Sequence, residues 1–504
     1  MAPPVIACFK PWRFLGSIAM AGNRPLWRWI GAAAAGVLAG LALPPWGCPP
    51  LLWLALVPLW ALGPAPALLW GGAAVLISHR WLLWLHPLDW VGVPLPLSLP
   101  LCLVLWLLLG VVAAALVGAW RLLVQRLGPE RLSTAVLAAA VWGLAEVLLA
   151  KGPLFWIGVG SAVLPGDRAL AGLAQLCGAG GLAALQLLLA WWLWRWLTAW
   201  VSQRPTAWRS AGAWLLVVLV LHGCGWRLLP VAGAAGDPVA LLVLQPAIPT
   251  REKFSWTQQQ ALLRRLASAQ AQAERLGVDA LVLPEGALAL GETLPRESQV
   301  EVLSGGFRLS GSALRSSVLR FAPGALQPVQ AIDKHRLVPL GEWIPGAAWL
   351  SWSGLSAVGG VTFGEPSRVL QRPDGPIGVA ICYEIADGAA LAAAARDGAG
   401  WLLASANLDP YPAQLQGQFA ALAQLRAIET GRWLVSAANT GPSLLVDPAG
   451  AVRERLPLQG AGTMAVALEA RSALTGYSRT GEWPLLLLAA LGMTRRLQSR
   501  VRQS

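Results

Sequence analysis

The feature that most constrains this chain is a series of long apolar segments confined to its first half. The stretch from Leu101 to Trp120 contains no charged side chain, whereas the region from Gln245 to Arg275 is rich in Arg, Glu and Gln. A run of about 20 apolar residues is the length at which a helix crosses the ~30 Å hydrocarbon core of a bilayer. Over the whole chain 56% of the residues are apolar and 12% are charged, far outside the soluble range. The sequence therefore predicts a membrane protein whose second half lies outside the lipid.

Seven apolar segments predict about seven transmembrane spans. They lie at residues 27–44, 50–63, 66–86, 97–120, 133–150, 169–194 and 211–229. An eighth apolar stretch of 11 residues, Trp483 to Met493, precedes a cluster of arginines. Eleven helical residues rise roughly 16 Å, about half the hydrocarbon thickness, so the sequence leaves open whether this stretch spans the bilayer. We expect an α-helical polytopic membrane domain of about seven to eight spans.

Basic residues at the ends of the predicted spans indicate the orientation of the chain. They precede the first span and follow the fourth and the sixth, at Lys10, Arg13, Arg24, Arg28, Arg121, Arg126, Arg131, Arg195, Arg204 and Arg209. Because cytoplasmic loops carry an excess of Lys and Arg, seven spans would place everything after about residue 230 outside the cytoplasm. The arginines flank apolar segments and form no continuous stripe, so we attribute the net charge of +13 to orientation and expect no nucleic-acid partner.

The pattern after residue 239 changes to short apolar runs separated by turn signals. Strands are predicted at 239–244, 279–283, 316–321, 377–381, 400–405, 433–438 and 443–446, and amphipathic helices at 256–276 and 413–430. Strands that alternate with such helices make an α/β layered domain. The predicted divisions are a membrane domain at 1–232, a second domain at 239–470, and a C-terminal segment at 471–504 with a short last span.

Three polar residues directly follow apolar strands of this second domain: Glu285, Lys334 and Cys382. Sites of α/β sheets are built where strands end. A thiol is mostly protonated at neutral pH, so a nucleophilic Cys382 would need a base such as Glu285 and a cation such as Lys334. The chain has only four lysines against 34 arginines, so a lysine rather than an arginine at position 334 suggests a specific requirement for an ammonium group. The structural alternative is a small buried cysteine beside two solvated charges.

Motifs for other chemistry are missing from the sequence. The four histidines show no HExxH or other metal-ligand spacing, and no GxxxxGK[ST] run is present. We therefore expect neither a metal nor a cofactor, and any chemistry would run on side chains.

Three motifs resemble the catalytic motifs of the nitrilase superfamily in order and spacing. They are Leu283-Pro-Glu-Gly286, Lys334-His-Arg-Leu-Val-Pro-Leu-Gly-Glu-Trp-Ile-Pro345 and Ile381-Cys-Tyr-Glu-Ile385. With the preceding spans, the chain resembles the apolipoprotein N-acyltransferases, the membrane branch of that superfamily, over nearly its whole length. The resemblance implies an αββα sandwich for the second domain. It also implies the bacterial inner membrane as location, with this domain on the periplasmic side.

Carried over residue by residue, the resemblance implies a role for each matching position. Glu285 would be the general base, Lys334 would stabilise the tetrahedral intermediate, and Cys382 would be the nucleophile. Supporting positions are Glu342, Tyr383 and Glu384. The opening motif Gln245-Pro-Ala-Ile-Pro249 with Phe254 and Trp256 implies substrate binding, as does Asn407, and Thr480-Gly-Glu-Trp-Pro484 resembles the closing motif.

Two segments depart from the family pattern. Arg315-Ser-Ser317 stands where an Asn is common, so no amide role is assigned there. Asn407-Leu-Asp-Pro-Tyr-Pro412 replaces a loop that often reads Asn-Asp-x-Trp and is expected to border the acyl pocket. His335 is not favoured as a catalytic partner, because in a continuing strand its side chain would point away from that of Lys334.

The implied activity is a two-step acyl transfer. An acyl chain of a membrane phospholipid would move to a Cys382 thioester, and then to the α-amino group of the N-terminal S-diacylglyceryl-cysteine of an apolipoprotein. The predicted partners are thus the phospholipid donor, the apolipoprotein acceptor and the bilayer. Two alternatives remain: a membrane-tethered amidase of the nitrilase type, and a non-enzymatic transporter or scaffold. Glu146 is the clearest intramembrane ionisable residue for transport, although a packing or hydrogen-bonding role is as readily expected.

Overall fold

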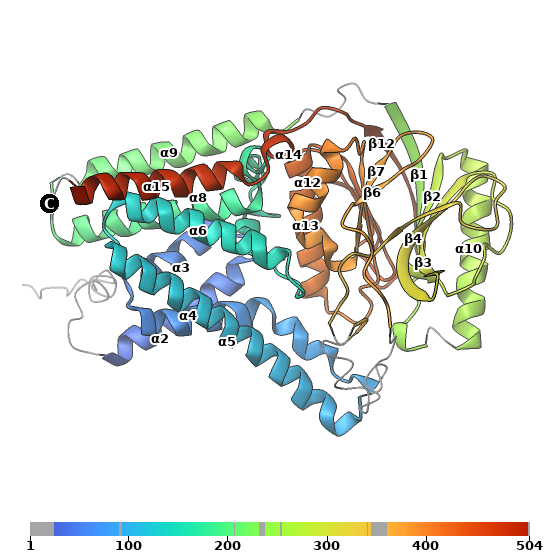
Figure 1. Cartoon of the computed structure of the whole chain (residues 1–504), viewed down its shortest axis with the longest axis horizontal. Coiled ribbons are helices and arrows are strands. Elements are labelled where there is room, and N and C mark those ends of the chain that lie inside the picture. The colour runs from blue at the N-terminus through green and yellow to red at the C-terminus, as the bar shows by residue number, and fades with distance from the viewer. Residues whose placement is uncertain are drawn as a thin grey trace, which may run out of the picture.

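The computed structural model describes residues 25–89, 93–205, 207–230, 237–252, 255–339, 341–343 and 360–501. Within this part of the chain, a helical half is followed by an α/β half built on two sheets (Figure 1). The last helix, α15 (Trp483–Val501), returns to the helical half and packs against α6 (Leu132–Ala150). The two ends of the described chain therefore belong to the same half.

In the described part of the chain, the helical half consists of seven main helices and α15. Besides α6, these are α2 (Pro25–Ala42), α3 (Pro49–Ala61), α4 (Pro64–Ser78), α5 (Leu95–Leu127), α8 (Ala174–Val201) and α9 (Ala207–Leu228). Among the described helices, α5, α6, α8 and α9 are long and apolar enough to cross a membrane. The shorter apolar helices are α2, α3, α4 and α15. Each predicted apolar segment is thus helical, and four reach a crossing length by themselves.

Three of these segments differ in extent from the prediction. The third is interrupted, because α4 ends at Ser78 and a 3-10 helix, η1 (Arg80–Leu85), follows. In the sixth, Asp167 caps the short α7 (Arg168–Ala171), and α8 kinks at Gly178, where φ is 62°. The helix α15 is 19 residues long rather than 11, because it continues past the apolar stretch through the arginines.

The α/β half contains twelve described strands in two six-stranded sheets, which pack against each other. The first sheet has the order β12-β1-β2-β3-β4-β5, and the second β11-β10-β9-β8-β7-β6. The strands are β1 (Asp237–Gln245), β2 (Ala280–Leu288), β3 (Glu301–Ser310), β4 (Ala313–Phe321), β5 (Gln330–Asp333), β6 (Val369–Leu370), β7 (Ile377–Ile381), β8 (Leu402–Ala406), β9 (Leu434–Ala438), β10 (Leu444–Val446), β11 (Val452–Arg455) and β12 (Gly462–Ala470). Buried aliphatic side chains from both sheets, such as Val243 and Val435, form one core between them.

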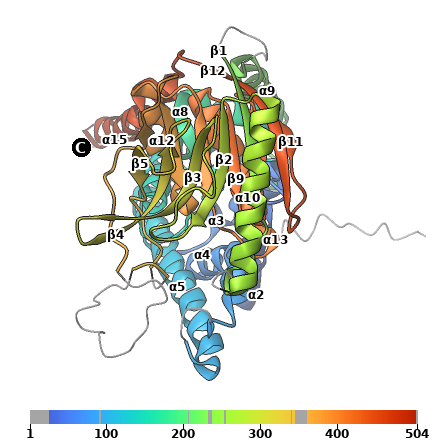
Figure 2. The same ribbon diagram turned by 90° about the vertical axis from the view of Figure 1, so that its right-hand side faces the viewer.

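Helices cover the outer faces of the two sheets. The helix α10 (Trp256–Leu276) lies outside the first sheet, as Figure 2 shows, while α12 (Gly388–Arg396) and α13 (Ala413–Thr430) lie between the second sheet and the helical half (Figure 1). The layers make an αββα sandwich. In α10, Ser255 caps the first turn and Gly277 ends the helix in the left-handed conformation, as helix-capping preferences predict.

The helix α13 joins the two halves through buried polar contacts. The Gln418 side chain donates hydrogen bonds to the carbonyl oxygens of Ser78 at 2.9 Å and Pro44 at 3.3 Å. At Gly417 an added Cβ would lie only 2.5 Å from Cβ of Pro45, so glycine permits this close approach. The second sheet is thereby held directly against the helical half.

Candidate active site

The three predicted catalytic positions meet where β2, β5 and β7 end their regular pairing. Lys334 follows β5, and its Nζ donates hydrogen bonds to Glu285 Oε1 and to Glu342 Oε1, each at 2.8 Å. The Lys334 side chain is 1% exposed. One buried ammonium therefore serves two carboxylates, and the cluster of these three residues carries a net charge of −1 when all are ionised.

Cys382 lies at the start of a 3-10 turn, η6 (Cys382–Ala386), directly after β7. Its φ is 56°, in the left-handed region that non-glycine residues rarely occupy. Such conformations cost about 1–3 kcal/mol and persist where the surrounding structure imposes them. The backbone N–H of Tyr383 donates a hydrogen bond to the Cys382 thiol and favours the thiolate. The sharp turn therefore holds the sulfur and a backbone donor together.

Glu384 ties the cysteine strand to the lysine loop. Its buried carboxylate accepts backbone N–H bonds from Ile381 at 2.8 Å, His335 at 2.7 Å and Arg336 at 3.0 Å. The guanidinium of Arg368 adds an ion pair at 3.0 Å. The Glu384 carboxylate therefore has a structural role, because its hydrogen bonds and its ion pair all go to residues that support the site. Arg368 was not identified from the sequence, because it belongs to no local motif.

Two further supporting positions surround the lysine. The second oxygen of Glu342, Oε2, accepts the Val338 N–H at 2.9 Å, which fixes this carboxylate. The Tyr383 hydroxyl donates to the Leu337 carbonyl oxygen at 2.7 Å, and its ring centroid lies 5.9 Å from Lys334 Nζ. Both side chains therefore hold the loop that follows Lys334.

The His335 side chain is engaged away from this cluster. Its Nδ1 lies 2.7 Å from the carbonyl oxygen of Gly364, so this ring nitrogen donates a hydrogen bond there. No hydrogen bond joins His335 to Cys382 in the described part of the chain. The geometry matches the expectation that the two neighbouring side chains, of residues 334 and 335, diverge.

The predicted substrate-binding positions are placed differently from one another. The Asn407 backbone N–H donates to Glu285 Oε2 at 3.0 Å, while its side chain contacts Thr250 and Asn439, each at 3.1 Å. Trp256 is 74% exposed at the first turn of α10. Phe254 lies outside the described residues.

Asn439 is a second site residue that sequence reasoning missed. Its side chain pairs with both backbone groups of Ile248, accepting at 2.9 Å and donating at 2.7 Å. It thereby fastens the loop after β1 to the end of β9, next to Asn407. Together with Glu285 these residues border a small cavity of about 10 Å³. An asparagine after a buried strand was a visible signal, but the contact partner lies 191 residues away.

Burial and charge set the protonation states of the cluster. Burial opposes a charge on Lys334, yet the carboxylates of Glu285 and Glu342 hold its pKa well above the ordinary value. Burial also raises the pKa of the Cys382 thiol well above its usual range; the Glu285 carboxylate adds to this and Lys334 opposes it. Burial raises the pKa of Glu342, which Lys334 partly offsets. The cysteine therefore rests as a thiol and requires a base to react.

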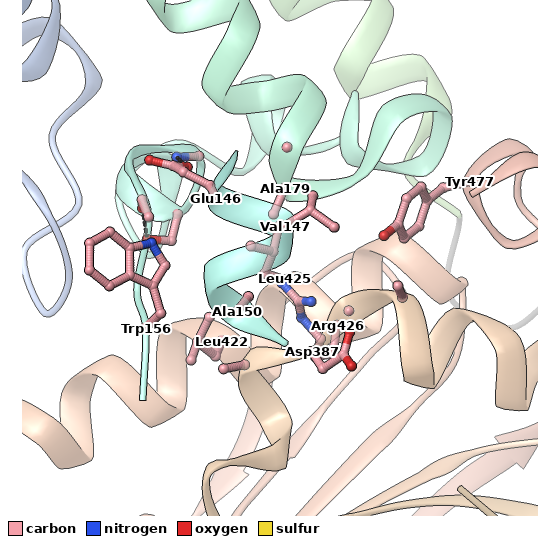
Figure 3. Close-up of a pocket in the computed structure, with 17 residues that line it drawn as sticks. Glu146, Val147, Ala150, Trp156, Ala179, Asp387, Leu422, Leu425, Arg426 and Tyr477 are labelled. Carbon is pink, nitrogen blue, oxygen red and sulfur yellow. Dashed lines mark hydrogen bonds between the residues drawn. The ribbon is translucent and has the colours of Figure 1, made fainter. Parts of the chain in front are cut away.

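A separate cavity of about 40 Å³ lies between α6, α8 and the helices of the second sheet. In Figure 3, Glu146 and Trp156 line one side, Tyr477 lines the other, and Arg426 lies between them. The Glu146 carboxylate accepts hydrogen bonds from Trp142 Nε1 at 2.9 Å and from the Val159 N–H at 2.8 Å. Glu146 therefore has a hydrogen-bonding role between segments of the helical half. The cavity volume suits a few water molecules.

The described residues contain no group of three or more His, Cys, Asp or Glu side chains placed to hold a metal ion. The polar groups that converge on Cys382 are instead one ammonium, two carboxylates and a backbone N–H. An ammonium and an N–H can bind a developing oxyanion, and a carboxylate can accept a proton from a thiol or an amine. The arrangement is thus suited to acyl transfer through a cysteine.

Comparison with known proteins is consistent with this chemistry. Residues 239–475 match the carbon-nitrogen hydrolase family. An apolipoprotein N-acyltransferase of Prochlorococcus marinus (strain MIT 9313) is 50% identical over 94% of this chain and 96% of its own length. The protein of the same name from Parasynechococcus marenigrum (strain WH8102) is 49% identical over 91% of this chain and 97% of its own. Among solved structures, Saccharomyces cerevisiae Nit3 of the nitrilase superfamily aligns with a TM-score of 0.35 and 16% identity, over 46% of this chain and 90% of its own.

The two curated relatives thus match both halves of the molecule, and the family model covers the half that holds the Glu285, Lys334 and Cys382 cluster. A soluble carbon-nitrogen hydrolase would account for the second half alone. The chain therefore belongs to the apolipoprotein N-acyltransferase family and is an acyltransferase of the membrane, with a nitrilase-like domain in its second half.

Proposed function

We propose that this enzyme moves an acyl chain from a membrane phospholipid to the α-amino group of the N-terminal S-diacylglyceryl-cysteine of apolipoproteins, through a thioester on Cys382. The observation that carries the proposal is the buried Lys334 ammonium, held at 2.8 Å by both Glu285 and Glu342 beside that cysteine. This arrangement supplies a nucleophile, a proton acceptor and an oxyanion-binding cation at one point.

In the first half-reaction, the Cys382 sulfur attacks the carbonyl carbon of the acyl ester, and the thiol proton passes to the Glu285 carboxylate. The tetrahedral oxyanion is bound by Lys334 Nζ and the Tyr383 backbone N–H. The bond between the carbonyl carbon and the glycerol oxygen then breaks, and that oxygen takes the proton from Glu285. The products are a lysophospholipid and the thioester.

In the second half-reaction, the α-amino nitrogen of the acceptor attacks the thioester carbonyl and gives a proton to Glu285. The carbon–sulfur bond breaks, and the proton returns to the Cys382 sulfur. An amide is more stable than an oxygen ester, so the sum of both steps is downhill without a nucleotide. Because both substrates use one site in turn, ping-pong kinetics follow.

The location we propose is the bacterial inner membrane, with the sandwich domain on the periplasmic side. This location is supported by the excess of basic residues before the first predicted span and after the fourth and sixth, which are the three ends predicted to be cytoplasmic. We also propose the division into residues 1–232, 239–470 and 471–504, with a catalytic role for the second part. Substrate contacts of Phe254, Trp256 and Asn407 belong to the same proposal. A helical half in the bilayer gives two lipid-anchored substrates access to one site.

The thioester is tested by incubating the purified enzyme with phospholipid that carries a radiolabelled acyl chain, without acceptor. We expect label on the protein that hydroxylamine releases, and no label on Cys382→Ala. The matched control is Cys224→Ala, which removes an exposed thiol of α9 and should label like the wild type. Label that persists on Cys382→Ala, or a wild type that never acquires label, would contradict the proposal.

A further inference from the structure

Tyr411 lies in the loop between β8 and α13, where this chain departs from the family pattern. The chain contains 29 tryptophans, eight phenylalanines and only three tyrosines, at 383, 411 and 477. A position that needed only a large aromatic ring would most often be filled by tryptophan in such a composition. A tyrosine here therefore draws attention to its hydroxyl group.

The ring of Tyr411 packs at the junction of the two halves. It lies edge-on to Trp81 of η1, with ring centroids 5.7 Å apart. Trp81 in turn contacts Phe155 edge-on at 6.0 Å, and Phe155 stacks on Phe419 of α13 at 5.8 Å. These four rings form an aromatic row to which each half contributes two members. The apolar body of Tyr411 thus continues a surface made by the helical half.

Buried amides fix the position of this loop. The Gln414 and Gln418 side chains donate to the Ser78 carbonyl oxygen at 3.0 and 2.9 Å, just before η1. The Gln416 side chain donates to the carbonyl oxygen of Tyr411 itself at 3.4 Å. The loop and the start of α13 are therefore held against the element that carries Trp81. A group that is fixed before substrate binds can position it at little entropic cost.

Tyr411 lies in the loop that begins at Asn407, whose backbone N–H bonds Glu285 Oε2 at 3.0 Å, so this loop borders the catalytic cluster. The Tyr411 hydroxyl has no hydrogen-bond partner among the described residues. Burial raises its pKa, the charges of Cys382, Glu285 and Glu342 raise it further, and Lys334 opposes them. The charges of the catalytic cluster therefore favour the protonated phenol. It stays a neutral O–H donor that is free to bond a ligand.

We propose that the Tyr411 hydroxyl donates a hydrogen bond to an ester oxygen of the phospholipid donor that leaves with the lysophospholipid, while the ring contacts the adjoining methylenes. The inference rests on the proposed function. In the proposed mechanism, Lys334 and the Tyr383 N–H bind the oxygen of the reacting carbonyl. The Tyr411 hydroxyl is therefore available for another ester oxygen, and a glycerophospholipid carries two acyl esters. An ester followed by an alkyl chain matches a polar tip on an apolar ring.

The test separates the two half-reactions in the full-length enzyme, with Tyr411→Phe, which keeps the ring. Single-turnover labelling by an acyl-labelled diacyl phospholipid measures the first step, and chase of the isolated thioester with a diacylglyceryl peptide measures the second. One neutral hydrogen bond corresponds to about a three- to tenfold loss of kcat/KM in the first step. The second step should change less than about twofold, because the ester oxygen has left by then. Tyr477→Phe, which removes a phenol that bonds Glu482 instead, should leave both steps unchanged.

Each outcome of the test is decisive. First-step labelling of Tyr411→Phe at the wild-type rate would overturn the inference. An equal loss in both steps would also overturn it, because it would assign the hydroxyl to the structure of the site rather than to the donor. A wild type without hydroxylamine-labile label would overturn the proposed function and this inference with it.

Discussion

Replacing Lys334 with methionine should destabilise the nitrilase-like domain strongly, because it removes the one cation between two buried carboxylates. The Lys334 side chain is 1% exposed, and both of its bonds, to Glu285 and Glu342, are 2.8 Å long. Removing one partner of a buried ion pair costs about 3–5 kcal/mol, and a loss that leaves two carboxylates belongs at the upper end. For a domain of this size, 1 kcal/mol corresponds to roughly 2–4 °C, so we expect a midpoint about 10–20 °C lower.

The pH dependence of this loss follows from the pKa of Glu342. Burial raises that pKa, and Lys334 is the main group that lowers it, ahead of the Val338 N–H, so Lys334→Met raises it further. A carboxyl whose folded pKa exceeds its unfolded value stabilises the fold below the unfolded pKa. That contribution is lost as the pH rises through the folded pKa. The deficit of Lys334→Met should therefore be smaller at pH 5 than at pH 8, and adding Glu342→Gln should recover part of it.

The assay is thermal unfolding in detergent, followed by tryptophan fluorescence at one scan rate and at both pH values. Lys151→Met serves as the control, because Lys151 is an exposed lysine at the end of α6 and its loss should shift the midpoint by less than about 1 °C. A midpoint of Lys334→Met within about 2 °C of the wild type would refute the reasoning. So would a double variant no more stable than the single one.

Two further substitutions probe the same cluster. Glu285→Gln should reduce acyl transfer at least about 100-fold, because the proposed base is lost. The same substitution should lower the pKa of Cys382, so that iodoacetamide alkylates this thiol faster at pH 8. Slower alkylation would contradict the assigned electrostatics. Gly305→Ala would place a Cβ 2.4 Å from Glu285 Cα and 2.4 Å from the Pro284 carbonyl oxygen. We expect kcat to fall about 100-fold through displacement of the base. Gly462→Ala, whose Cβ would meet nothing closer than 3.6 Å, should match the wild type, and equal rates for both glycine variants would argue against this displacement.

Most of the strands that the sequence predicted read as continuous apolar runs. Buried parallel strands such as β7 and β8 have this pattern because both of their faces are covered. The strand β3 was missed, since Ser304-Gly305-Gly306 lies in its middle and lowers its strand propensity. Its glycine at 305 is required by the close approach of Glu285 on the neighbouring strand. The contact with Glu285 thus requires a glycine at position 305, although glycine has a low strand propensity.

The strand β12 was missed for a different reason. Met464, Val466 and Leu468 point inward, while the residues between them are the exposed Ala465 and Ala467. Alanine counts as apolar in a pattern, so the alternation that marks a half-buried strand is hidden. Only the pairing of β12 with β1 reveals its register.

For the site, the sequence could place residues at strand ends but not the contacts between distant segments. Glu285, Lys334 and Cys382 each follow an apolar run, so local pattern and motif identified them. Arg368 bonds Glu384, 16 residues away, and Asn439 bonds Ile248, 191 residues away. No local sequence pattern predicts either of these partners. Long-range hydrogen bonds of this kind become visible only once the sheets are paired.

The junction of the two halves explains how the proposed site for two lipid-anchored substrates stays rigid. Gln418 of α13 buries an amide group that donates to the carbonyls of Ser78 and Pro44 in the helical half, and the half-buried Gln414 also donates to Ser78. Separating the halves would leave these groups without partners inside an apolar contact, at about 1–3 kcal/mol for each group. Hinge motion between the sandwich and the helices is therefore opposed at the point nearest Tyr411. In the proposed reaction the donor and the acceptor both diffuse in the plane of the bilayer, so the substrates come to the site. The fixed junction would keep Cys382 in one place for each of them in turn.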